Sequence, residues 1–310
     1  MAITAATKTS DFSGFLNPDQ SGPIFESARR QSVVQQLARQ VPLGMNGVEI
    51  PVVTGKIEAG WVAEAGQKPA SKGSMALKTI APKKIAAIAV VSAEVVRANP
   101  GGYMNEIRPQ IGEAFAAAFD SAALHGTNSP FGAGNNLEAS TKAVELGTAA
   151  ASAGGLHTDI TNGLRLLVND KKRLTGFAFD ETVEPTFLLS VDSQGRPIYV
   201  ESPLEDTAPA ARQGRLIGRP AFMGQGVSEA VPGTPSTAYT VGYGGDWSQA
   251  AWGVVGGISY RVSTEATVTI NGTLTSLFEN NLVAILAEAE YGWLVNDAQA
   301  FVKYTETTAA

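Results

Sequence analysis

The alternation of apolar and polar positions predicts a long, thin hairpin within residues 46–97. A strand signal at residues 48–53 leads to the segment 60–64 and a polar loop over residues 65–74, and a second apolar run extends over residues 80–96. A two-stranded ribbon is marginally stable in water, and an open strand edge pairs readily with another chain. The pattern therefore indicates a hairpin that something outside this polypeptide covers, although a hairpin packed on its own core fits the spacing as well.

Apolar residues three or four positions apart predict three helices. The first covers about residues 23–40, and the third about residues 159–174, with the basic residues 171–173 in its last turn. The second and most regular pattern covers residues 104–122. Pro109 falls inside that pattern, so we expect this helix to begin near the proline or to kink there.

Strand patterns dominate the second half of the chain. The longest covers residues 281–295, where an apolar face alternates with a face that carries Glu288 and Glu290. Residues 126–155 indicate a loop with one short strand pair. Shorter strands are predicted at residues 186–191, 197–200, 238–243, 251–255 and 258–262.

Composition excludes several classes of protein. The 310 residues, 44% of them hydrophobic, are enough for one large core or two smaller ones. The absence of cysteine excludes disulfides, thiolate metal sites and cysteine nucleophiles. No apolar run is long enough to cross a bilayer, and the N-terminus lacks a hydrophobic segment of signal-peptide length. We therefore expect a globular protein, with no membrane partner, that is made and used in a cytoplasm.

Charge divides unevenly along the chain. Residues 46–84 carry six lysines against three glutamates, whereas residues 85–310 carry 13 basic and 23 acidic side chains. A basic hairpin on an acidic body suits head-to-tail association of identical copies. Two alternatives are a solvated loop whose lysines protect an open edge and, less favoured because the net charge is negative, a nucleic-acid surface.

Catalytic chemistry has little support in the sequence. His125 and His157 have no metal-ligand spacing around them, and three Gly-x-Gly fragments lack the third glycine of a dinucleotide fingerprint. We expect no catalytic residue, no cofactor and no metal. The acids Asp180, Glu181 and Glu184 are the one candidate for a cation site or an acid/base pair, and a solvated turn explains them as well.

The order of these segments resembles the major capsid proteins of tailed bacteriophages with the HK97 fold. The likeness covers nearly the whole chain and rests on order and spacing. It follows the arm, the hairpin with its segment 60–64 (GWVAE), residues 85–97, the long helix ending at 124–127 (LHGT), residues 214–220 (GRLIGRP) and the closing segment 278–303.

The resemblance implies an α+β, HK97-like fold with four parts. Residues 1–45 correspond to an N-terminal arm with a helix, and residues 46–84 to the extended E-loop hairpin. Residues 85–155 and 271–310 correspond to a peripheral (P) domain with a long spine helix and long strands. Residues 156–270 correspond to an α/β axial (A) domain.

The resemblance also implies the function. A major capsid protein is a structural protein that self-assembles as hexamers and pentamers into an icosahedral shell enclosing phage DNA. The E-loop lies on a neighbouring subunit in that family, which implies subunit-interface roles for Trp61, Glu64, Lys68, Lys72, Lys83 and Lys84.

Further partners and locations follow from the same resemblance. A portal protein is expected, decoration proteins can be added to the shell, and packaged double-stranded DNA is expected inside. Self-scaffolding relatives carry a long charged segment before the arm, and this chain has only a short polar lead, so a separate scaffolding protein is expected. The protein should reside in the virion capsid, and in the host cytoplasm during assembly.

Several alternatives stay open at this point. An encapsulin nanocompartment shares the fold and encloses a cargo enzyme instead of DNA. From other classes, an enzyme that uses Asp180, Glu181 and Glu184 and a monomeric β-rich binding module are alternatives. In some capsids an E-loop lysine is linked covalently to an asparagine, which suggests Lys68 or Lys72 with Asn296, against the reading of ordinary surface lysines.

Overall fold

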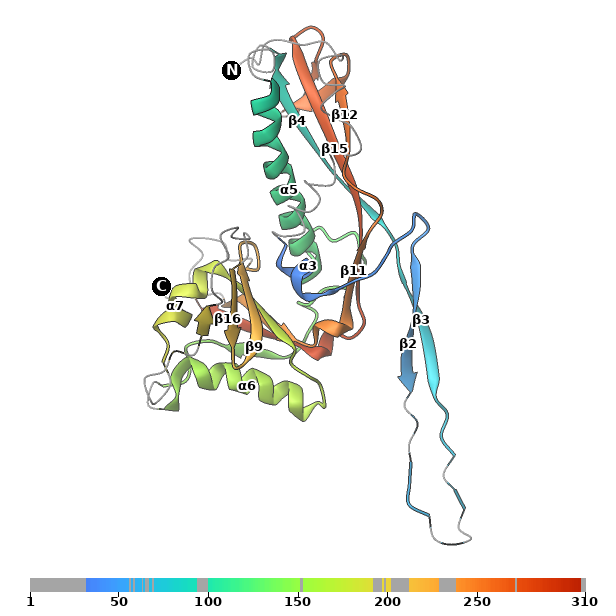
Figure 1. The fold of residues 1–310 in the computed structure, drawn as a ribbon, viewed down its shortest axis with the longest axis vertical. Helices are drawn as coiled ribbons and strands as arrows, with labels where there is room; N and C mark the ends of the chain where they lie inside the picture. The colour runs from blue at the N-terminus through green and yellow to red at the C-terminus, as the bar shows by residue number, and fades with distance from the viewer. Residues whose placement is uncertain are drawn as a thin grey trace.

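The molecule has two packed sheets with helices and one hairpin that projects far beyond them (Figure 1). This computed structural model describes residues 32–55, 57, 59–62, 64, 67–68, 70–93, 100–150, 153–191, 197, 199–201, 212–228, 238–270 and 272–307. The predicted arm up to residue 31 lies outside these ranges.

A five-stranded sheet forms the elongated part of the molecule. Its central strand β15 (Leu282–Val295) pairs antiparallel with β4 (Lys83–Ser92) on one side, and with β11 (Ala250–Val254) and β12 (Ser259–Ser263) on the other. The short strand β1 (Arg39–Gln40) adds in parallel to β11. Alternate residues of β15 are buried along its whole length, because one face packs into the core.

Helix α5 (Pro100–Leu124) lies along this sheet (Figure 1). Phe119 is the centre of an aromatic cluster between helix and sheet, with its ring centroid 5.3 Å from that of Tyr291 and 5.9 Å from that of Trp293. Edge-to-face and tilted ring pairs of this kind add to the free energy gained from burial.

A seven-stranded sheet forms the second packed part. Its order is β5-β16-β10-β6-β9-β8-β7, and helix α6 (Gly155–Asn169) packs against β16 and β5. The strands are β5 (Ala143–Glu145), β6 (Gly176–Asp180), β7 (Tyr199–Glu201), β8 (Arg212–Leu216), β9 (Arg219–Gly224), β10 (Ala238–Gly245) and β16 (Phe301–Thr307). Gly242 belongs to a Gly-x-Gly fragment, and a Cβ there would lie 2.1 Å from the Phe179 ring. Close packing therefore explains this glycine.

The remaining elements are short. Two of them, β13 (Thr267–Ile270) and β14 (Thr273–Ser276), form a small hairpin before β15. The others are the helices α3 (Val33–Leu37) and α7 (Glu184–Leu189) and the 3₁₀ turns η3 (Glu181–Val183), η4 (Trp247–Gln249) and η5 (Ala298–Ala300). No described helix has the length and apolarity needed to cross a membrane.

The projecting hairpin consists of β2 (Val48–Gly55) and β3 (Ser74–Ile80), which pair only with each other among the described strands. The hairpin is therefore confirmed, but its predicted extent to residue 97 is wrong. The apolar run from residue 83 onward belongs to β4, because β15 offers that strand a longer, buried partner than β2 does.

Several predicted helix boundaries are also wrong. The first helix ends at Leu37, and the next two residues form strand β1 against β11. Helix α5 begins at Pro100 and continues through Pro109; a proline at the first helical position costs nothing, because its missing N–H would have no partner there. Helix α6 ends at Asn169, before the basic residues, because Lys171 turns the chain with a φ of 57°.

The strand predictions in the second half are mostly confirmed. The predicted strands at 238–243, 251–255, 258–262 and 281–295 correspond to β10, β11, β12 and β15. Residues 186–191 are wrong as a strand, since most of them form helix α7. The single strand β5 stands where a strand pair was predicted, and it pairs with the distant β16.

Candidate subunit interface

The projecting hairpin has two chemically different faces. On one face, Ile50 and Val52 are half-buried toward the body. On the opposite face, Val53 and Met75 are cross-strand partners, as are Pro51 and Leu77, and all four side chains are exposed. We call these four residues the outer face of the hairpin. The exposed fractions are 61% for Val53, 68% for Met75 and 65% for Leu77, so three large apolar side chains meet solvent together.

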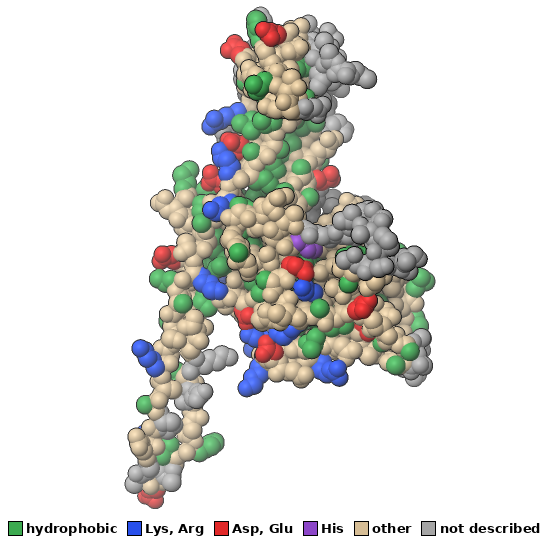
Figure 2. All heavy atoms as spheres, turned by 180° about the vertical axis from the view of Figure 1, so that it is seen from behind, with side chains coloured by type: hydrophobic (Ala, Val, Ile, Leu, Met, Phe, Trp, Pro, Cys, Tyr) green, Lys and Arg blue, Asp and Glu red, His purple; other side chains and the backbone are tan. Residues whose placement is uncertain are grey.

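Figure 2 shows hydrophobic side chains along this hairpin, which stands clear of the body. Scattered single exposed apolar residues are ordinary, but a contiguous patch on a thin element marks an interaction surface. Beyond the strands, Trp61 is fully exposed and Ile57 is 77% exposed. The described part of the hairpin therefore presents apolar side chains from its strands to its far loop.

The base of the hairpin is fixed to the body. Ile80 is completely buried, and a Cβ on Gly292 would lie 2.5 Å from its side chain. The Lys78 Nζ donates a 2.6 Å hydrogen bond to the backbone oxygen of Asn296. A rigid base with an exposed outer part holds the apolar surface away from the subunit's own core.

The predicted interface residues fall in two places. Trp61, Glu64, Lys68 and Lys72 are exposed on the far part of the hairpin. Lys83 and Lys84 lie at the beginning of β4 instead, on the five-stranded sheet.

The two lysines of β4 have different environments. The Lys84 Nζ lies 2.7 Å from the Glu288 carboxylate of the same subunit, and this hydrogen bond lowers the pKa of Glu288. Lys83 is exposed and forms no ion pair with any residue that the structure describes. Of the pair, Lys83 is therefore the one available to a partner.

The suggested covalent partners are separated within one subunit. Asn296 lies at the base of the hairpin, where its side-chain amide donates to Gln249 at 2.7 Å. Lys68 and Lys72 lie beyond the far ends of β2 and β3. A link between them would have to join two subunits, and it remains a prediction.

The acids at residues 180–184 have structural partners. The Asp180 carboxylate accepts hydrogen bonds from the Thr182 amide and hydroxyl and from the Ser228 amide, and so caps η3. Glu181 accepts from the Gln225 side chain at 3.3 Å. Glu184 is buried at the beginning of α7. Within the described ranges no group of three or more His, Cys, Asp or Glu residues is placed to hold a metal ion.

His125 belongs to a hydrogen-bonded network that the sequence did not indicate. The Tyr243 hydroxyl donates to Glu138 Oε2 at 2.7 Å and lies 2.9 Å from His125 Nδ1. The Lys303 Nζ donates to Glu138 Oε1 at 2.7 Å. Burial alone would raise the pKa of Glu138, but the hydrogen bonds from Lys303, Tyr243 and Thr240 and the Lys303 charge outweigh it and lower that pKa. The network joins the end of α5 to β10 and β16.

Asp120 joins α3 to α5 in a similar way. Its buried carboxylate accepts hydrogen bonds from the Ser32 hydroxyl at 2.5 Å and from the Val33 amide at 3.0 Å, at the beginning of α3. Burial raises the pKa of Asp120 to about 7, although these hydrogen bonds act in the opposite direction. Sequence periodicity places Asp120 on the helix but cannot show its partner 88 positions away.

Comparison with known proteins identifies the family of this chain. The sequence profile of the phage capsid family matches residues 13–305. The chain is 41% identical to the probable major capsid protein gp17 of Mycobacterium phage D29, over 99% of this chain and 95% of that protein. The corresponding protein of Mycobacterium phage L5 is also 41% identical, over 98% of this chain and 93% of that protein. The chain belongs to the phage capsid family.

Solved structures agree with this assignment. A chain of Mycobacterium phage Adephagia superposes with a TM-score of 0.69 at 18% identity, covering 99% of this chain and 100% of that chain. A chain of Gordonia phage Cozz gives a TM-score of 0.68 at 24% identity, covering 90% of this chain and 87% of that chain. The predicted α+β, HK97-like fold is confirmed.

Membership of the phage capsid family settles the class of function. This phage capsid family protein is a structural shell protein of a bacteriophage and not an enzyme. Its place is the capsid of the virion, which many copies of the same chain build. The prediction of a major capsid protein is confirmed.

Proposed function

We propose that this chain assembles as hexamers and pentamers into an icosahedral shell around double-stranded phage DNA, with each hairpin lying on a neighbouring copy. The observation that carries the proposal is the outer face of the hairpin. A thin two-stranded ribbon with exposed Val53, Met75 and Leu77 is marginally stable in water unless another surface buries these side chains. Fully burying one such side chain contributes about 1.5–3 kcal/mol, and every copy in a shell would contribute three.

The proposal assigns the four parts of the fold to roles. Residues 46–84 act as the E-loop between subunits, and residues 85–155 and 271–310 as the peripheral domain. Residues 156–270 act as the axial domain around the capsomer centre, and residues 1–45 as the arm. Assembly takes place in the host cytoplasm with a separate scaffolding protein and a portal protein, and decoration proteins can bind the finished shell.

The test replaces the outer face of the hairpin. We expect the triple variant Val53→Ser, Met75→Ser, Leu77→Ser to fold as a subunit with unchanged circular dichroism, because these side chains support no core of their own chain. It should elute as free subunits or capsomers, whereas the natural chain, expressed with its scaffolding protein, forms shell-sized particles. Electron micrographs and size-exclusion chromatography report the difference.

A matched control makes the same chemical change elsewhere. Leu166 and Val168 are exposed apolar residues on α6, and Leu166→Ser with Val168→Ser should leave assembly intact. Normal shells from the hairpin variant would refute the interface role. Particles from infected cells should contain nuclease-protected DNA; a protein cargo in its place would support the encapsulin alternative.

A further inference from the structure

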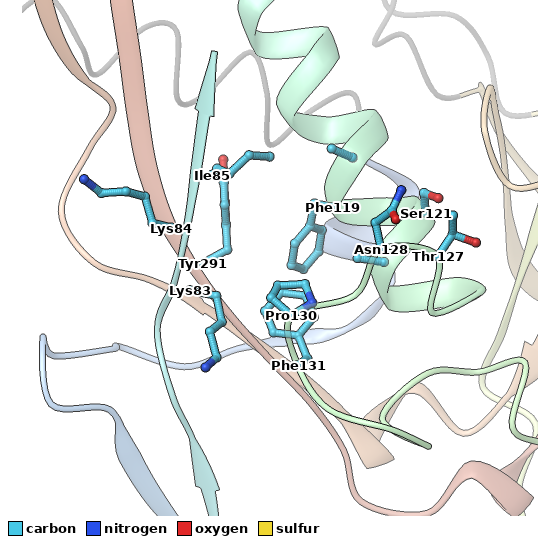
Figure 3. A pocket seen from close by; sticks show the side chains of 12 residues that line it. Lys83, Lys84, Ile85, Phe119, Ser121, Thr127, Asn128, Pro130, Phe131 and Tyr291 are labelled. Carbon is cyan, nitrogen blue, oxygen red and sulfur yellow. The ribbon is translucent and has the colours of Figure 1, made fainter.

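A mostly apolar pocket opens beside the long helix α5. It has a volume of about 310 Å³ and lies between the second half of α5, the loop at residues 127–131 and the beginning of β4. Figure 3 shows Phe119, Phe131 and Tyr291 around it, with Ile85 on the strand opposite the helix. Lys83 and Lys84 also line it, and in Figure 3 the Lys84 side chain points away from the rings.

The size and lining of this pocket suit one aromatic side chain. A cavity of about 150 Å³ lined by apolar groups already accepts benzene, so about 310 Å³ accommodates an indole. Aromatic walls favour an aromatic guest, because tilted and edge-to-face ring pairs add to the free energy of area burial. Both lining lysines come from β4, and Lys84 is paired with Glu288, so Lys83 is the cation available there to a guest with an acid close to its ring.

Trp61 has these properties. It is fully exposed, whereas Trp247, Trp252 and Trp293 are buried in the core. Glu64 follows three residues later and is also exposed, which provides a carboxylate for Lys83. The hairpin projects far beyond the body (Figure 1), and Trp61 follows the far end of β2, so it cannot reach the pocket of its own subunit. The only Trp61 that can enter is that of a second copy.

We infer that the pocket formed by Ile85, Phe119, Phe131 and Tyr291 is the socket for Trp61 of a neighbouring subunit, with Glu64 of that neighbour paired to Lys83. This inference rests on the proposed function, because it requires that the hairpin lies on another copy. It goes beyond that function by naming the residues of the two subunits that are in contact. Phe278, 75% exposed and followed by Glu279, is a rival occupant.

The first experiment fills the pocket with a larger side chain of the same subunit. Ala118 is exposed on α5 and lines the pocket, so Ala118→Phe should occupy it without disturbing the core. Ala117→Phe adds the same ring one position away, outside the lining, and is the matched control. Acrylamide quenching of tryptophan fluorescence reports Trp61, since the other three tryptophans are buried; a Trp61→Phe chain supplies the background.

The expected results distinguish binding of Trp61 in this pocket from the more general contact of the hairpin with a neighbouring subunit. In assembled particles of the natural chain, the quenching constant of Trp61 should fall several-fold relative to free subunits. Ala118→Phe particles or capsomers should keep Trp61 quenchable, and Ala117→Phe should behave as the natural chain does. Protection of Trp61 in Ala118→Phe particles would overturn the socket while leaving the trans hairpin intact. Full quenching in natural particles would overturn both.

The second experiment uses the absence of cysteine in the natural chain. After treatment of assembled particles with a short bismaleimide, whose length stands in for the two longer side chains, the pair Glu64→Cys and Lys83→Cys should give cross-linked oligomers on a denaturing gel, and neither single variant should do so. The pair Glu279→Cys and Lys83→Cys tests the rival. Linkage in the rival pair alone would assign the pocket to Phe278 and contradict the inference.

Discussion

The Asp120 carboxylate is buried between two helices, and its ionisation opposes folding. Its pKa is about 7 in the folded subunit and near 3.8 in an unfolded chain, so the folded state holds the proton more tightly. Stability should therefore decrease as the pH rises from about 4 to about 7, and this contribution should level off above pH 7.

The Asp120→Asn variant tests this dependence. It keeps the side-chain size but has no proton to lose, so its free energy of unfolding should lack the decrease between pH 4 and pH 7. The difference between the two chains across that range should be on the order of 2–4 kcal/mol. Thermal or denaturant unfolding of free subunits measures it. Parallel pH profiles for the two chains would contradict the buried, raised-pKa carboxylate.

The Tyr243 hydroxyl links the end of α5 to the seven-stranded sheet through His125 and Glu138. Tyr243→Phe removes one oxygen and leaves the buried ring in place. We expect a loss of about 1.5–3 kcal/mol in the free energy of unfolding, because the lost hydrogen bond goes to a charged carboxylate.

Tyr239→Phe, four residues earlier on β10, is the control for this change. Tyr239 packs against the hydrophobic core between α6 and the seven-stranded sheet but has no part in the network, so the loss from Tyr239→Phe should be small. Urea unfolding curves of both variants decide the matter. Equal effects would show that the hydrogen bonds of the Tyr243 hydroxyl add no more than the Tyr239 hydroxyl does.

At the scale of elements, sequence periodicity predicts the long, half-buried ones well. The strand at residues 281–295 and the helix centred on residues 104–122 have one face in the core over many turns or pleats, so their patterns are unambiguous. Strand β6 is buried at all five positions, and a fully buried strand has no alternation to detect. Helix α7 has six residues, too few for a helical period to outweigh its strand-like composition.

The candidate interface could be predicted only in part. The lone, basic hairpin and its Trp61 follow from sequence, since a ribbon without a partner is visible as a pattern. The pocket is not visible in this way, because β4, α5, the loop at 127–131 and β15 supply its walls from distant positions. The sequence does not predict the ion pair of Lys84 with Glu288 either, because the two residues lie on strands that are far apart along the chain.

The lysines of the hairpin and of the beginning of β4 should tune assembly electrostatically. Replacing Lys68, Lys72 and Lys83 by glutamine should slow assembly most at low ionic strength, where their attraction to an acidic neighbour is least screened. Lys84 is left unchanged because it pairs with Glu288 of its own subunit. Light scattering during assembly at several salt concentrations measures the effect. An equal loss at every concentration would indicate packing contacts instead of charge.

At the scale of the whole molecule, non-covalent contacts should account for the strength of the shell. The chain has no cysteine, and Asn296 lies far along the chain and the fold from Lys68 and Lys72 in the same subunit. Particles boiled in detergent should give a single band at 32.2 kDa on a denaturing gel. A ladder of larger species would establish the covalent link of Lys68 or Lys72 with Asn296 and refute this prediction.

The role proposed for the hairpin is a contact between neighbouring subunits of the shell. The most direct measurement is an electron cryomicroscopy reconstruction of the assembled particle at a resolution that shows side chains. We expect Val53, Met75 and Leu77 to be covered by a neighbouring subunit and Trp61 to be buried there. A particle in which these side chains face solvent, or pack only on their own subunit, would contradict it.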